Sequence, residues 1–126
     1  MSKNEPEKDH TLSLLLDLDG VSFFVDHAES WRVKFEVRRV PPTGERPRGI
    51  SYAITLHGPS GKRVFGYDNA HPTQATGGPG GKKTRSQDHV HRDDTIRPYK
   101  FKDAATLLAD FWTNVDRILD SKGVKK

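Results

Sequence analysis

The alternation of apolar and charged residues is clearest between Trp31 and Val40. Apolar side chains take every second position there, and charged side chains stand between them; the apolar set is Trp31, Val33, Phe35 and Val37. Because side chains in a strand point alternately to its two faces, this period of two predicts a half-buried strand over residues 31–40. The sequence Pro41-Pro42-Thr43-Gly44 ends that strand and opens a polar loop.

Two further runs predict strands that follow in the same sheet. Residues 50–56 and 63–67 are rich in β-branched and aromatic side chains, and the turn sequence Gly58-Pro59-Ser60-Gly61 separates them. Residues 89–91 are expected to return to the sheet as a short strand. Because short turns join consecutive strands, the pairing is expected to be antiparallel, as in a meander.

The N-terminal apolar runs are expected to form a hairpin. Residues 11–18 are a continuous apolar run, and residues 21–25 form a second, shorter run. Between them stands Asp19-Gly20, a dipeptide typical of hairpin turns. The pattern therefore predicts two more strands at the start of the sheet.

Residues 103–119 follow a different period. Apolar side chains recur three or four positions apart and form one stripe of a helix, namely Ala104, Leu107, Leu108, Phe111, Val115, Ile118 and Leu119. Asp103 is expected to cap the start of this helix, and Gly123 lies just beyond its end. The stripe requires a sheet face to cover. The predicted fold class is therefore α+β, an antiparallel β-meander sheet packed by one C-terminal amphipathic α-helix.

The length of 126 residues is that of one domain. Residues 1–10 are polar and aperiodic and are expected to be disordered. The single domain is expected over residues 11–121, with a flexible Gly-rich loop at 72–86. Residues 122–126 are predicted to form a basic tail.

The composition excludes several kinds of site but does not by itself indicate a function. Lys and Arg number 21 against 17 Asp and Glu, and this net charge of +4 permits binding to a polyanion without requiring it. The chain has no cysteine, which excludes disulfides, thiolate metal sites and a thiol nucleophile. No apolar run approaches the ~20 residues of a membrane span, and residues 1–6 lack the apolar centre of a secretory signal. A cytoplasmic location without membrane contact is expected.

The segment Asp88-His89-Val90-His91-Arg92 is the richest in candidate chemistry. In an extended chain His89 and His91 point to the same face. Two imidazoles on one face can act as a general acid–base pair, or bind a divalent metal that a third ligand completes. Arg92 can hold a phosphate in its fork of donors. Two surface histidines on an edge strand are an equally simple interpretation of the same spacing.

A second polar group follows the strand predicted at 63–67. Asp68, Asn69 and His71 stand directly after Tyr67 at the strand end. Short polar side chains at such a place form Asx-turns as readily as sites. Asp68, His71 or Asp88 is the candidate third ligand if the histidine pair binds a metal, and no cofactor is otherwise expected.

Four segments in this order resemble one protein family. They are Tyr67-Asp68-Asn69, Asp88-His89-Val90-His91, Pro98-Tyr99-Lys100-Phe101, and Leu107-Leu108-Ala109-Asp110-Phe111-Trp112 with Val115. Their order is similar to that of the TumE-type toxins of prokaryotic toxin–antitoxin pairs, over roughly residues 31–120. The resemblance implies a small intracellular protein, paired with a helix-turn-helix antitoxin, whose activity harms the cell through RNA.

The resemblance carries over by position to Tyr67, Asp68, Asn69, Asp88, His89 and His91. Because RNA supplies its own nucleophile in the 2′-hydroxyl, a ribonuclease needs only an acid, a base and phosphate stabilisation. In this hypothesis His89 and His91 are the acid and base, and Asp68 or Asp88 orients an imidazole. Phosphate or RNA contacts fall to Arg92, Lys82, Tyr67, Asn69 and His71.

Two alternatives remain open at the level of sequence. One is a non-catalytic module that binds RNA or protein through the basic face of the strand at 31–40. The other is a metal-dependent hydrolase built on the histidine pair. In each case unpaired sheet edges make pairing with an antitoxin, or a homodimer, a reasonable expectation.

Overall fold

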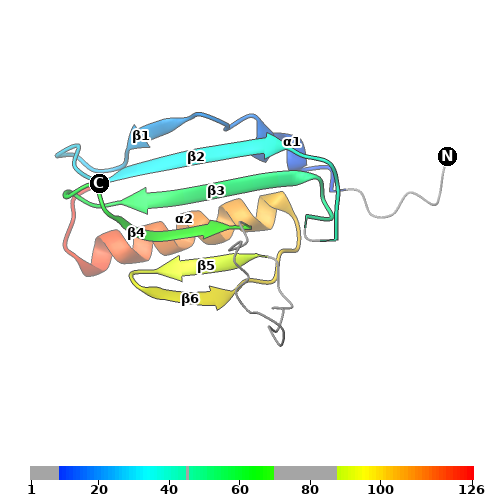
Figure 1. Cartoon of the computed structure of the whole chain (residues 1–126). Helices are drawn as coiled ribbons and strands as arrows, with labels where there is room; N and C mark the ends of the chain where they lie inside the picture. The colour runs from blue at the N-terminus through cyan, green and yellow to red at the C-terminus, as the bar shows by residue number, and fades with distance from the viewer. Residues whose placement is uncertain (1–8, 45, 70–87) are drawn as a thin grey trace.

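The computed structural model describes residues 9–44, 46–69 and 88–126. Within these residues the chain forms two helices and one six-stranded sheet (Figure 1). The elements are α1 (Leu12–Leu16), β1 (Ser22–Phe24), β2 (Arg32–Arg39), β3 (Ile50–His57), β4 (Arg63–Asp68), β5 (His89–Arg92), β6 (Thr95–Pro98) and α2 (Ala104–Ser121). The α+β fold class predicted from the sequence is confirmed.

The sheet is an antiparallel meander in which each strand pairs with the next along the chain. The predicted strands at 31–40, 50–56, 63–67 and 89–91 are confirmed as β2 to β5. β6 was not predicted, because it is only four residues long and all four are exposed, so it has no buried face. It is held at the sheet edge by its pairing with β5.

The prediction of a strand over residues 11–18 is wrong. Residues 12–16 form the short helix α1, in which Leu15 is buried and Leu14 is exposed. Leucine permits a helix because it is not β-branched, and packing of this turn against α2 and β2 places Leu15 in the core. The hairpin across Asp19-Gly20 is therefore absent. Instead Asp19 Oδ1 accepts a hydrogen bond from the backbone N–H of Val37 (2.8 Å) and fixes the turn against β2.

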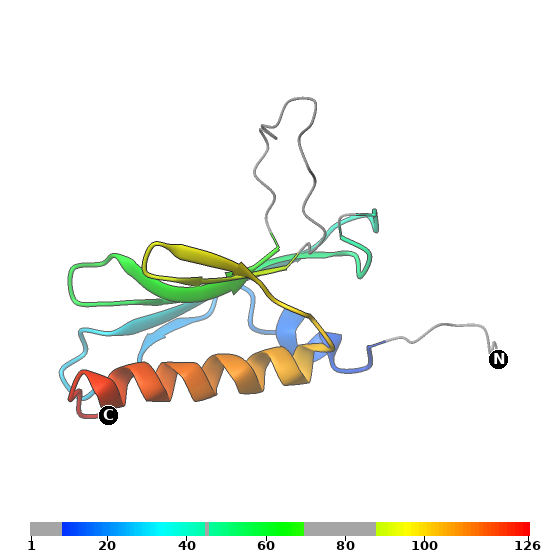
Figure 2. The same cartoon turned by 90° about the horizontal axis from the view of Figure 1, so that it is seen from below.

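α2 runs along one face of the sheet and covers it (Figure 2). Its predicted stripe is buried, apart from Leu108, which is half-buried. The alternate residues of β2, β3 and β4 that face α2 complete the core, among them Phe35, Ile54 and Phe65. Edge-on contact of the Phe35 and Phe111 rings, with centroids 5.7 Å apart, joins the two layers.

Both ends of α2 are held as the sequence indicates. Asp103 accepts a hydrogen bond from the N–H of Thr106 (2.7 Å), which confirms the predicted N-cap. Gly123 has a positive φ of 69°, the left-handed conformation that ends helices.

The described residues contain no helix with the length and apolar character of a membrane span.

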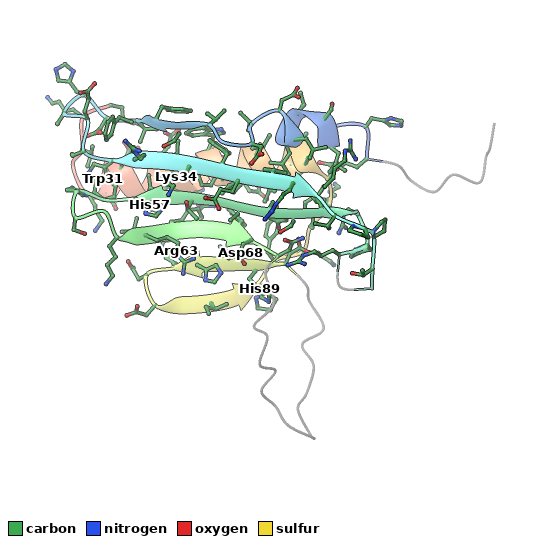
Figure 3. All side chains as sticks on the ribbon, turned by 45° about the horizontal axis from the view of Figure 1, so that its top comes forward. Trp31, Lys34, His57, Arg63, Asp68 and His89 are labelled. Carbon is green, nitrogen blue, oxygen red and sulfur yellow. The ribbon has the colours of Figure 1, made fainter. Side chains whose placement is uncertain are left out.

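The face of the sheet opposite α2 is called the outer face below. Strand alternation places polar and small side chains on it, whereas the apolar ones face α2. Figure 3 shows that the outer face carries Lys34, His57, Arg63 and Asp68. The domain limits, the Gly-rich loop at 72–86 and the disorder of residues 1–10 stay predictions, since 1–8 and 70–87 lie outside the described residues.

Candidate functional site

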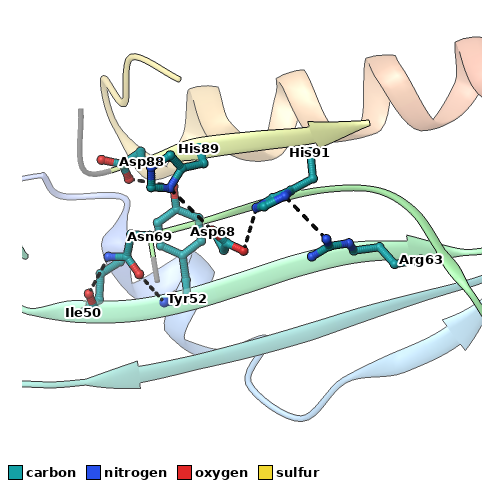
Figure 4. Close-up of polar contacts among 8 residues, drawn as sticks. All are labelled: Ile50, Tyr52, Arg63, Asp68, Asn69, Asp88, His89 and His91. Carbon is teal, nitrogen blue, oxygen red and sulfur yellow. Dashed lines mark hydrogen bonds and ion pairs between the residues drawn. The ribbon is translucent and has the colours of Figure 1, made fainter. Parts of the chain in front are cut away.

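The pairing of β4 with β5 assembles a group of polar side chains on the outer face. Asp68 pairs with His89, and Gly66 pairs with His91. Paired residues of neighbouring strands point to the same face, so Asp68 meets both imidazoles there (Figure 4). The sequence predicted that the two histidines share a face, and the register adds the carboxylate between them.

Asp68 uses one carboxylate oxygen toward each imidazole. Its Oδ2 lies 3.0 Å from Nε2 of His91, and its Oδ1 lies 3.8 Å from Nδ1 of His89. The two imidazole ring centroids are 6.4 Å apart. All three side chains are shielded, with 12–15% of their surface exposed. A single carboxylate is thus placed to stabilise positive charge on either ring, in a site partly withdrawn from water.

Arg63 joins this group from the start of β4. One of its terminal nitrogens lies 3.4 Å from Nδ1 of His91. The register of β3 and β4 shifts between Leu56 and His57, because Leu56 pairs with Phe65 and His57 pairs with Arg63. This bulge at Val64 turns Arg63 to the outer face, whereas uninterrupted alternation from Phe65 would turn it toward α2. No local pattern in the sequence marks this bulge, and Arg63 was therefore not predicted as part of the group.

The contacts of His91 define its proton positions when the ring is neutral. A guanidinium can only donate, so Nδ1 accepts from Arg63 and the proton resides on Nε2, facing Asp68. Nε2 is buried, and no described residue gives it a well-aligned hydrogen bond. Its 3.0 Å contact with Asp68 is therefore electrostatic in character.

Small residues form the surface beside these side chains. A Cβ on Gly66 would lie 2.8 Å from the carbonyl oxygen of Ile54 and 2.8 Å from the Thr55 methyl group, so only glycine fits there. Two residues further along β4, Asp68 pairs with another small residue, Ala53. A shallow hollow of about 420 Å³ opens next to Asp68 over β2 and β3, lined in part by Glu36, Arg38 and Ala53. The carboxylate is therefore accessible from the outer face.

Asp88 lies in a different environment from Asp68. It precedes His89 and so points to the α2 side of β5, where it is buried and accepts a hydrogen bond from the hydroxyl of Tyr52 (2.7 Å). Burial raises the pKa of Asp88, against the opposing effect of Tyr52 and the positive charge of Arg48. Burial also raises the pKa of Tyr52, which keeps its hydroxyl protonated as the donor. These contacts are those of a structural pair.

Asn69 and Tyr67 also have structural contacts. The Asn69 side chain accepts from the N–H of Tyr52 (3.0 Å) and donates to the carbonyl of Ile50 (2.9 Å), so it continues the sheet beyond β4. Tyr67 is buried under α2, where its hydroxyl accepts from Asn114 (3.1 Å). Neither side chain reaches the outer face.

The remaining predicted phosphate contacts are not brought to this group. Arg92 pairs with Phe65, so alternation directs it to the side of α2, away from the two histidines. His71 and Lys82 lie outside the described residues. The described group is thus Asp68, His89, His91 and Arg63.

The hypothesis that the histidine pair binds a metal requires a third ligand, and none is in place within residues 9–44, 46–69 and 88–126. No cluster of three or more His, Asp or Glu side chains in those ranges is arranged to hold a metal ion. His71, named from the sequence as one candidate third ligand, is outside them.

Comparison with protein families identifies the family of the chain. The family described as toxin TumE matches residues 5–119, which is most of the chain. No curated protein and no solved structure matches the chain.

Proposed function

The chain belongs to the toxin TumE family, and on that premise we propose that it cleaves RNA by general acid–base catalysis, as the toxin of a toxin–antitoxin pair. One observation carries the catalytic part: a carboxylate, Asp68, stands between two imidazoles on an accessible sheet face. This arrangement holds two proton-transfer groups on the same side of a substrate. RNA needs no further nucleophile, because its 2′-hydroxyl attacks the adjacent phosphate.

The proposed chemistry divides the proton transfers between the two histidines. One imidazole takes the proton of the 2′-hydroxyl, and the other donates a proton to the leaving 5′-oxygen. With ring centroids 6.4 Å apart, both can reach one phosphodiester. Asp68 stabilises whichever ring is protonated. The products are a 2′,3′-cyclic phosphate and a free 5′-hydroxyl.

Arg63 is the proposed phosphate ligand in place of Arg92 and Lys82. Its guanidinium lies on the outer face 3.4 Å from His91, close to where the phosphate would bind. A planar fork of donors suits two phosphate oxygens and the charge that builds on them in the transition state. When Arg63 turns to the phosphate, it releases Nδ1 of His91 for proton transfer.

The partner follows from the family. We propose an antitoxin that binds this chain and contains a helix-turn-helix, with both proteins in the cytoplasm, where RNA is present. Among the described strands β1 and β6 are the sheet edges, and they offer unpaired backbone groups to an antitoxin or to a second copy.

The test compares bacterial growth after tightly induced expression of the wild type and of variants. His89→Ala and His91→Ala, alone and together, are expected to abolish growth arrest, since each general acid or base contributes about 10²–10⁴-fold to rate. His27→Ala is the matched control, because its exposed side chain lies in the loop between β1 and β2 and is not part of the described group. Circular dichroism establishes that each variant is folded.

Cleavage of purified RNA and of translating ribosomes then identifies the activity. Arrest and cleavage by the wild type and His27→Ala, but not by the double variant, would support the proposal. Arrest that survives in the folded double variant would move the chemistry elsewhere. Cleavage abolished by a chelator would favour a metal-dependent hydrolase, and salt-sensitive RNA binding without cleavage would favour a binding module.

A further inference from the structure

A second hollow lies on the outer face beside the group just described. Its volume is about 450 Å³, within the range of about 300–1,000 Å³ for small-molecule sites. Arg63 lines this hollow and also contacts His91, and Glu36 and Ala53 line both this hollow and the one beside Asp68, so the hollow adjoins the proposed cleavage site. A group bound in the hollow would therefore be attached to the phosphate at the histidines, if the ligand is RNA.

The floor of the hollow consists of small side chains. Ala53 and Thr55 contribute from β3, and Thr55 pairs with Gly66 on β4. Small residues on three neighbouring positions leave the sheet surface low and flat. Figure 3 shows Lys34 on β2 along one side of this surface and Arg63 on β4 along the other. A flat ring can lie on such a floor with its edges facing the margins.

Lys34 and Glu36 form the β2 margin. They are two residues apart and so point to the same face, opposite Thr55 and Ala53 respectively. Within the described part of the chain neither side chain has a hydrogen bond or ion pair. An ammonium and a carboxylate thus stand side by side, both available to a ligand.

His57 is part of the wall but is already engaged. Its Nδ1 lies 3.0 Å from the carbonyl of Gly61, which can only accept, so Nδ1 carries the proton. Its Nε2 therefore accepts from the hydroxyl of Thr55 at 3.0 Å. This uses the hydrogen of Thr55 as well. Lys34, Glu36 and Arg63 remain as the charged groups that stand on the strands beside the floor. Three more charged residues, Lys62, Asp93 and Asp94, line the hollow from the turns before β4 and after β5.

We propose that this hollow binds a guanine base of the RNA substrate; the inference rests on the ribonuclease function proposed above. Guanine presents two adjacent donors, N1–H and N2–H, which match the two oxygens of Glu36. It also presents two adjacent acceptors, O6 and N7, the usual targets of Lys and Arg. Lys34, which stands next to Glu36 on β2, is placed to meet them, and Arg63 stays with the phosphate.

The other bases fit these groups less well. Adenine and cytosine place an acceptor nitrogen beside their single amino group, and uracil places two carbonyls beside its one N–H. Each would turn an acceptor toward the Glu36 carboxylate, which is repulsive. In the bound RNA the 3′-phosphate of the guanosine would extend past Arg63 to His91, so cleavage would follow a guanosine.

The test measures binding and cleavage separately. The 3′-monophosphates of guanosine, adenosine, cytidine and uridine are titrated into the full chain and followed by NMR. We expect guanosine 3′-monophosphate to bind roughly tenfold more tightly than the others, and Glu36→Gln to remove that preference. Glu29→Gln, which removes one exposed carboxylate outside the hollow, is the matched control and is expected to keep it.

Mapping of cut sites in RNA completes the test. Equal binding of the four nucleotides, or a guanine preference that survives in Glu36→Gln, would overturn the guanine site. If the wild type cleaves RNA without preference for guanosine, the hollow is not a base site, although the proposed function stands. If guanosine 3′-monophosphate binds preferentially but no RNA is cleaved, the hollow stands and the ribonuclease function fails.

Discussion

At the scale of the residue, neighbouring positions of one strand have separate roles because their side chains alternate. His89 and His91 reach the outer face beside Asp68, whereas Asp88 between β5 and the core is buried against Tyr52. The same alternation removes Arg92 from the group. The Asp68 carboxylate therefore contacts the two imidazoles, whereas the Asp88 carboxylate accepts a hydrogen bond from a buried tyrosine and belongs to the core.

Asp88→Asn tests this separation through pH. Burial raises the pKa of Asp88 above its usual 3.8, so between the two values the folded chain binds more protons than the unfolded chain. Wild-type stability should then rise, relative to the variant, as pH falls through the raised pKa, and level off below 3.8. Urea unfolding of both proteins from neutral pH to below 3.8 measures the difference.

A stability difference that is constant with pH would contradict the assignment. The folded Asp88→Asn variant should also retain RNA cleavage, because asparagine can still accept the hydrogen bond of Tyr52. Loss of cleavage in a folded variant would return Asp88 to the catalytic group.

At the scale of the element, α2 begins with its backbone donors satisfied by residues far away in the sequence. Asp9 Oδ2 accepts from the N–H of Ala104 (2.8 Å), and Thr11 Oγ1 accepts from the N–H of Ala105 (3.0 Å). Together with the Asp103 cap these contacts satisfy three of the four N-terminal donors of the helix. The segment before α1 thus fastens the start of α2.

Asp9→Ala is expected to lower the free energy of unfolding by about 1 kcal/mol, the usual cost of losing such a cap. The control is Asp17→Ala, since that exposed aspartate is the C-cap residue of α1 and lies away from the start of α2, and it should stay within about 0.5 kcal/mol of wild type. Denaturant unfolding compares the three proteins. Equal stability of Asp9→Ala and wild type would show that residues 9–11 do not hold the helix.

At the scale of the whole molecule, the two faces of the sheet have different tasks. The face toward α2 contains the core, in which Phe111 is fully buried. The outer face carries the proposed chemistry on exposed or shielded polar groups such as Arg63. Stability and activity should therefore respond to different substitutions.

A pair of variants measures this separation. Phe111→Leu is expected to lower the free energy of unfolding by about 1–3 kcal/mol and to leave cleavage per folded molecule unchanged. Arg63→Gln is expected to stay within about 0.5 kcal/mol of wild type and to lose about 10²-fold in cleavage rate. Unfolding curves and initial rates on the same samples check both. Parallel losses of stability and rate in the two variants would show that the faces are not independent.

Local patterns in the sequence determined the meander, α2 with its cap, and the common face of His89 and His91. Each depends on a period of two or 3.6 within one segment, which burial of apolar side chains enforces. The same period already implied that Asp88 and Arg92 face away from the histidines.

Only the tertiary structure decided which segments meet. The register of β4 on β5 set Asp68 against the histidines, a bulge at Val64 turned Arg63 beside them, and packing against α2 made residues 12–16 a helix. These outcomes depend on contacts between residues distant in sequence. The hydrophobic period within one segment carries no information about such contacts. The sequence therefore fixes the face on which each side chain lies, and the register between strands fixes its neighbours.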